Sequence, residues 1–109
     1  MSSDASAPSD PSTAQLVIVR GDGRGRLIPL DADVLIGRLS TNKLVIDDPA
    51  VSRVHARIVR QGGRVLVEDI GSLAGTFVNG RRIEAPTVLA DGDLIVVGPM
   101  AIVLCVASS

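Results

Sequence analysis

A chain of 109 residues, 46% of them hydrophobic and 21% charged, is long enough for one domain and apolar enough to bury a core. Its single cysteine and single histidine exclude an intrachain disulfide and a zinc site of ordinary ligand number, and Phe77 as the only aromatic residue excludes the base-stacking platforms of single-strand nucleic-acid binders. A formal net charge of −1 and the lack of an apolar run of about 18 residues argue against a nucleic-acid-binding stripe and a membrane span, so we expect neither partner.

The first 14 residues are rich in Ser, Asp, Ala and Pro and contain no Val, Ile or Leu. Such a segment has nothing to bury, so we predict a disordered polar tail over residues 1–14 and a folded domain over residues 15–109. Short runs of Val, Ile and Leu then recur along the chain, separated by Gly, Asp, Asn or Pro, and they indicate strands. The predicted strands are residues 16–20, 26–30, 34–37, 44–46, 54–60, 65–69, 76–78, 88–89, 94–97 and 101–106.

Glycine-containing turns separate several of these runs, most clearly at residues 61–63, 79–80 and 91–93. Glycine and asparagine accept positive φ at low cost, which suits tight connections between strands. No segment shows a sustained 3.6-residue apolar period, so little or no helix is expected. Many short strands in one domain indicate an all-β sandwich or barrel.

Three polar loops, residues 37–43, 47–53 and 71–76, hold the side chains with binding chemistry. Arg38, Ser52 and Arg53 are suited to an oxyanion if these loops converge, because guanidinium groups present a planar fork of donors that matches phosphate. Taken singly, surface arginines are more often solvated charges and turn serines more often cap the backbone. The order and spacing of the residues therefore have to decide the assignment.

That order resembles the forkhead-associated (FHA) domain family. The matching residues are Gly37-Arg38, Ser52-Arg53-Val54-His55, Asp69-Ile70-Gly71-Ser72, Gly75-Thr76-Phe77-Val78 and Asn79-Gly80, followed by the closing segment 89–98. The resemblance spans about residues 16–107. It implies a β-sandwich of about eleven short, mainly antiparallel strands that recognises phosphothreonine in partner proteins of Ser/Thr kinase signalling.

The resemblance also implies roles for individual residues. Arg38 is the expected main phosphate ligand, Ser52 is expected to donate its hydroxyl to a phosphate oxygen, and Arg53 borders the same site. The expected structural supports of the site are Gly37, His55, Gly75 and Asn79.

The third loop departs from the family pattern. Family members usually carry a polar residue and then Asn just before Gly-Thr, where this chain has Leu73 and Ala74. Both remain in the predicted peptide-binding surface, but neither side chain forms hydrogen bonds there. Each lost charge-assisted bond is worth about 1.5–3 kcal/mol, so affinity is expected to fall by roughly ten- to a hundredfold. An alternative function follows: a phosphate-independent protein–protein interaction or self-assembly module on the same fold.

No catalytic constellation stands out, because the only histidine already has an expected structural role. We therefore expect a binding protein rather than an enzyme, with no cofactor and no metal. The expected partner is a phosphothreonine-containing protein, either a kinase or a kinase substrate. The N-terminus lacks the basic start and apolar stretch of a signal peptide, so we expect a cytoplasmic protein, and a monomer is favoured.

Overall fold

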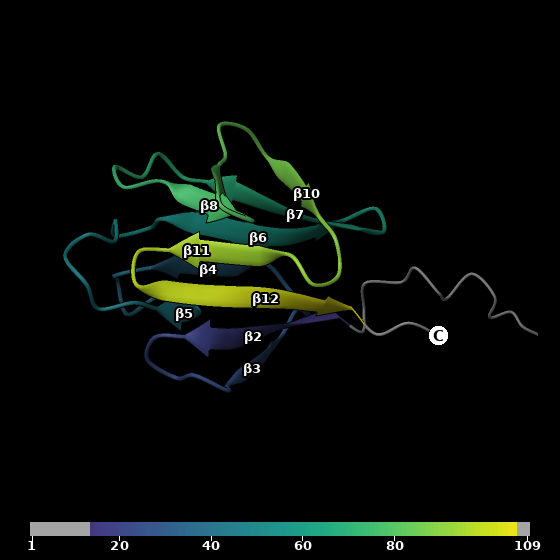
Figure 1. The fold of residues 1–109 in the computed structure, drawn as a ribbon, viewed down its shortest axis with the longest axis horizontal. Helices are drawn as coiled ribbons and strands as arrows, with labels where there is room; N and C mark the ends of the chain where they lie inside the picture. Colours follow the sequence, from purple (N-terminus) through teal and green to yellow (C-terminus); the bar gives the residue numbers. More distant parts are fainter. Residues whose placement is uncertain (1–13, 107–109) are drawn as a thin grey trace, which may run out of the picture.

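The computed structural model describes residues 14–106, which form eleven strands in two stacked sheets (Figure 1). In chain order the strands are β2 (Ala14–Arg20), β3 (Leu27–Pro29), β4 (Val34–Gly37), β5 (Leu44–Val45), β6 (Ala56–Gln61), β7 (Arg64–Asp69), β8 (Thr76–Val78), β9 (Arg81–Arg82), β10 (Thr87–Leu89), β11 (Leu94–Val97) and β12 (Met100–Val106). The predicted all-β sandwich is confirmed. No helix among these residues is long and apolar enough to cross a membrane.

The two sheets differ in size and in strand order. The larger sheet has six strands in the order β3-β2-β12-β11-β8-β9, and the smaller has five in the order β10-β7-β6-β4-β5. All neighbouring strands are antiparallel except β4 and β5, which are parallel. The parallel strands β4 and β5 are joined by a short loop of residues 38–43.

Most predicted strands agree with the observed ones to within two residues, and three differences have physical causes. Strand β6 begins at Ala56 rather than at residue 54, because the backbone bends at Arg53 and Val54. Strand β9 was missed, since two adjacent arginines have no apolar alternation to mark them. Strand β2 includes the buried Ala14, the last residue of the predicted tail; the other tail residues, 1–13, lie outside the described residues.

Alternating side chains from both sheets fill the space between them. On β6 the buried residues include Ala56 and Ile58, and on β11 they are Ile95 and Val97, as the period of two in a strand requires. Full burial of each large aliphatic side chain contributes roughly 1.5–3 kcal/mol. This rigid core is the scaffold from which the connecting loops project.

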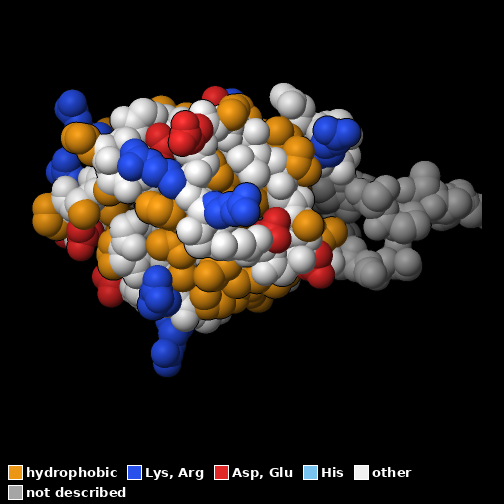
Figure 2. Space-filling view, turned by 45° about the horizontal axis from the view of Figure 1, so that its top comes forward, with side chains coloured by type: hydrophobic (Ala, Val, Ile, Leu, Met, Phe, Trp, Pro, Cys, Tyr) orange, Lys and Arg blue, Asp and Glu red, His pale blue; other side chains and the backbone are white. Residues whose placement is uncertain are grey.

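The outer face of the six-stranded sheet also carries apolar side chains. Leu27, Val17, Val103 and Leu94 are successive cross-strand partners on β3, β2, β12 and β11, and all four are exposed or half-buried. Figure 2 shows apolar side chains gathered over this sheet. An antiparallel sheet commonly presents polar residues on its solvent face, so this face is less polar than usual.

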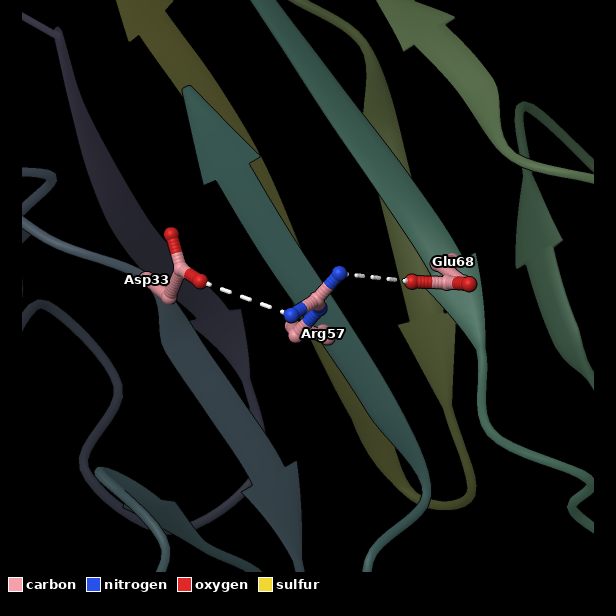
Figure 3. Close-up of polar contacts among 3 residues, drawn as sticks. All are labelled: Asp33, Arg57 and Glu68. Carbon is pink, nitrogen blue, oxygen red and sulfur yellow. Dashed lines mark hydrogen bonds and ion pairs between the residues drawn. The ribbon is translucent and has the colours of Figure 1, made fainter. Parts of the chain in front are cut away.

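The outer face of the five-stranded sheet is organised around one arginine. Arg57 on β6 lies directly opposite Glu68 on β7 in the strand register, and its guanidinium bridges Glu68 at 3.1 Å and Asp33 at 3.6 Å (Figure 3). These are the only ion pairs within residues 14–106. Because all three side chains remain partly exposed, each pair contributes at most about 1 kcal/mol.

Candidate functional site

Three loops meet at one end of the sandwich. The first loop (residues 38–43) follows β4, the second (46–55) precedes β6, and the third (70–75) joins β7 to β8. All three lie at the end opposite to Ala14 and Val106, the first and last described residues (Figure 1). The chain therefore brings together the three segments in which the sequence predicted binding residues.

Arg38 is held against the second loop at two points. Its backbone N–H donates to the carbonyl of Ser52 at 3.0 Å, and its side-chain Nε donates to the carbonyl of Val51 at 3.1 Å. The side chain is exposed, and no carboxylate among residues 14–106 forms an ion pair with it. Anchoring through Nε leaves the two terminal nitrogens, with four N–H donors, for a ligand.

Gly37 is required because the first two loops come so close together. Its φ angle is ordinary, but a Cβ at this position would overlap the backbone carbonyl of Arg53 and lie 2.8 Å from Asn42 Nδ2. Buried Asn42 joins the same loops, because its Nδ2 donates to the carbonyls of Leu39 at 2.9 Å and Arg53 at 2.8 Å. Close steric contact thus supports the predicted role of Gly37, whereas Asn42 was not predicted from the sequence.

His55 connects the second loop to the third and is fully buried. The backbone N–H of Ser52 donates to its Nδ1 at 3.1 Å, and its Nε2 lies 2.8 Å from the carbonyl oxygen of Gly75. Since a backbone N–H is only a donor, Nδ1 is the acceptor, and the proton is on Nε2, which donates to Gly75. The imidazole is therefore the neutral Nε2–H tautomer and fixes the backbone at Ser52.

Asp69 organises the third loop from its first residues. Its carboxylate accepts hydrogen bonds from the backbone N–H of Ser72 at 2.8 Å, from the Ser72 hydroxyl and from the Thr76 hydroxyl at 2.7 Å. Ser72 Oγ in turn accepts from the backbone N–H of Gly75 at 3.0 Å. Burial by itself raises the pKa of Asp69, but the hydrogen bonds from Ser72 and Thr76 outweigh it and lower the pKa below its ordinary value.

The lowered pKa of Asp69 predicts an acid-sensitive loop. A carboxyl group with a lower pKa in the folded state stabilises the fold above its unfolded pKa of about 3.9, and this contribution is lost as pH falls through the folded pKa. We expect the free energy of unfolding, measured by urea denaturation, to fall between about pH 5 and pH 3 and to fall less in Asp69→Asn. Asp22→Asn, on the exposed β2–β3 hairpin, controls for the loss of one charge. An equal fall in Asp69→Asn and wild type would contradict the assignment.

The rim of the third loop presents an apolar side chain and a nearby arginine. Leu73 is 83% exposed, and Ala74 beside it is also exposed. Arg82 on β9 donates from Nη2 to the carbonyl of Leu73 at 3.4 Å. The loop surface therefore combines hydrocarbon with a guanidinium group.

Asn79 supports the scaffold rather than the loops. It has a φ of 50° at the β8–β9 turn, its Nδ2 donates to Asp93 Oδ1 at 3.0 Å, and its Oδ1 accepts from the backbone N–H of Leu94 at 2.9 Å. These contacts tie the turn to the start of β11, and none of them reaches the three loops.

Most of the predicted site residues are thus connected by direct contacts. Hydrogen bonds and steric contacts link the following residues into one unit: Gly37, Arg38, Ser52, Arg53, His55 and Gly75. Leu73 and Ala74 precede Gly75 on the same loop. Asn42 and Arg82 were not predicted, because neither a polar residue in a loop nor a charged residue on a short edge strand signals such a contact in the sequence.

Comparison with known proteins indicates the same family as the sequence motifs. The model of the FHA domain family matches residues 34–98. The chain is 38% identical over 92 residues to glycogen accumulation regulator GarA of Mycolicibacterium smegmatis, over 84% of this chain and 58% of GarA. It is 39% identical over 92 residues to an oxoglutarate dehydrogenase inhibitor of Corynebacterium jeikeium, over 84% of this chain and 63% of that protein.

A solved structure agrees with these relatives. Mycobacterium tuberculosis EmbR in complex with a low-affinity phosphopeptide superposes with a TM-score of 0.79 and 34% identity, over 88% of this chain and 25% of EmbR. The chain belongs to the FHA domain family. The family assignment made from the sequence motifs is confirmed, while the chain spans only about six tenths of the length of the two curated relatives.

Proposed function

We propose that this chain binds phosphothreonine segments of partner proteins, with Arg38 as the main phosphate ligand and Ser52 and Arg53 beside it. The observation that carries the proposal is the anchored guanidinium of Arg38, which is fixed at Nε on the second loop and has no carboxylate partner among residues 14–106. A phosphothreonine carries about −1.5 to −2 charges near pH 7 and three acceptor oxygens, which suit the remaining donors of this group.

The neighbouring groups support the same ligand. No hydrogen bond within residues 14–106 uses the hydroxyl of Ser52, while its backbone is held in place by His55. Arg53 has an exposed side chain, and its carbonyl receives hydrogen bonds from the first loop. Two arginines and one hydroxyl on adjacent, tightly connected backbone form a compact site for a single phosphate.

The charge distribution also favours a single phosphate. The predicted folded domain holds ten acidic and eleven basic residues, so its positive potential is local. On the face shown in Figure 2, basic side chains lie as separate groups among neutral and acidic ones rather than in a continuous stripe. We propose a kinase or a kinase substrate as the partner, binding without catalysis as the activity, and the cytoplasm as the compartment.

An NMR titration tests the proposal. The labelled domain is titrated with degenerate peptide pools that contain phosphothreonine, phosphoserine or unphosphorylated threonine. We expect shifts at Arg38, Ser52 and Arg53 with the phosphothreonine pool only, while Arg57, on the outer face of the sheet, serves as an internal control. Binding at an exposed charged site is also expected to weaken with added salt.

A second candidate function has its own supporting observation. The exposed Leu73 and the apolar outer face of the six-stranded sheet are suited to a phosphate-independent interaction with a protein or with a second copy. No shift with any pool at millimolar peptide would overturn the phosphothreonine proposal and favour this second function.

A further inference from the structure

Arg82 is held against the third loop although its sequence position suggests no role there. Besides its hydrogen bond to the carbonyl of Leu73, its guanidinium fills the space above Gly75. A Cβ on Gly75 would lie 2.8 Å from Arg82 Nε and 3.0 Å from Arg82 Cζ, so the lack of a side chain at Gly75 leaves room for the arginine. The loop therefore positions this charge.

The strand register explains why Arg82 reaches the loop and its neighbour does not. Arg82 is the cross-strand partner of Phe77, and Arg81 is the partner of buried Val78. Opposed residues in an antiparallel pair share a face of the sheet, and residues two apart on one strand do so as well. Gly75 is two residues before Phe77, so Gly75, Phe77 and Arg82 lie on the same face of the sheet, whereas Arg81 lies on the other face.

Hydrogen bonds connect the proposed phosphate site to the segment beside Arg82. Hydrogen bonds run from the backbone of Ser52 through His55 to the carbonyl of Gly75, above which Arg82 lies. This link holds the second and third loops next to each other. A peptide with its phosphate at Arg38 that crosses the third loop brings a nearby residue to Arg82.

The charge of Arg82 is available to a partner. The only ion pairs within residues 14–106 are those of Arg57, and the hydrogen bond that the Arg82 side chain donates to the Leu73 carbonyl is long, at 3.4 Å. A guanidinium is always protonated and binds carboxylates through two parallel N–H donors. Ala74, next to it on the rim, offers no competing polar group.

We propose that Arg82 is a specificity-determining residue that selects a carboxylate side chain, Asp or Glu, a few positions from the phosphothreonine. This inference rests on the proposed function, since the phosphate at Arg38 sets the register of the peptide. It assigns to β9 a contact that neither Leu73 nor Ala74 is able to make.

The test compares phosphothreonine peptides that differ only by Asp or Asn, placed in turn at each of the positions flanking the phosphothreonine. Wild type is expected to bind the Asp peptide about two- to fivefold more tightly at one position, the range for an exposed ion pair. Arg82→Gln is expected to lose this preference, and Arg81→Gln, the matched control on the same strand, is expected to keep it. Isothermal titration calorimetry supplies the affinities.

Peptides without any carboxylate separate recognition from a purely structural role. If Arg82 only held the third loop, Arg82→Gln would weaken these peptides as much as the Asp peptides, and that result would overturn the inference. Equal affinity of wild type for the Asp and Asn peptides at every position would also overturn the inference. The proposed function would still hold in that case if wild type bound the phosphopeptides and Arg38→Ala did not. Failure of every phosphopeptide to bind wild type would overturn both.

Discussion

Replacement of Arg38 with alanine is expected to lower phosphothreonine-peptide affinity by about 100-fold or more and to leave the fold intact. The substitution removes at least two charge-assisted hydrogen bonds to the phosphate, each worth about 1.5–3 kcal/mol, and about 1.4 kcal/mol corresponds to a tenfold change. The fold is expected to survive because the side chain is exposed and its backbone bond to Ser52 remains. Calorimetric titration with a phosphopeptide measures the affinity, and the amide NMR spectrum reports on the fold.

Two further variants make the Arg38 result specific. Arg57→Ala removes a half-buried arginine from the outer face of the five-stranded sheet and is expected to retain binding, so it controls for net charge. Arg38→Lys keeps the charge but loses the planar fork and the Nε bond to Val51, so it is expected to bind with intermediate affinity. Unchanged affinity in Arg38→Ala would show that the phosphate lies elsewhere.

Replacement of His55 with alanine is expected to lower the free energy of unfolding by roughly 3–5 kcal/mol, a large part of the stability of a small domain. The substitution leaves a cavity at a fully buried position and removes the partners of the Ser52 N–H and the Gly75 carbonyl. Urea denaturation gives the change, with Lys43→Ala, an exposed change on the first loop, as the control.

The same variant tests the connection between the loops. Without the imidazole, the second and third loops lose their hydrogen-bonded link, so residual phosphopeptide binding by folded His55→Ala is expected to be weaker than that of wild type. A variant within about 1 kcal/mol of wild-type stability would fall inside the range of an ordinary substitution and would show that His55 is dispensable.

Local patterns predicted the strands well where alternation was strong. Residues 34–37, 76–78 and 94–97 form strands with the predicted limits, because inward Val and Ile side chains alternate with outward ones. The pattern was insufficient at Arg81–Arg82, which form a strand because Phe77 and Val78 pair with them and not because of any apolar content. This pairing depends on the adjacent strand β8, and the sequence of Arg81–Arg82 does not by itself indicate a strand.

The candidate site was likewise predictable from the sequence only in part. The residue types and their order were sufficient to predict the FHA family and the three loops, since these depend on spacing along the chain, and the same order is the basis for proposing Arg38, Ser52 and Arg53 as ligands. Two sets of contacts that stabilise the site were not predictable in this way. Asn42 donates hydrogen bonds to the carbonyls of Leu39 and Arg53, and Arg82 packs against Gly75. Both depend on how closely separate segments approach one another, and that distance is set by the packing of two whole sheets rather than by any local sequence.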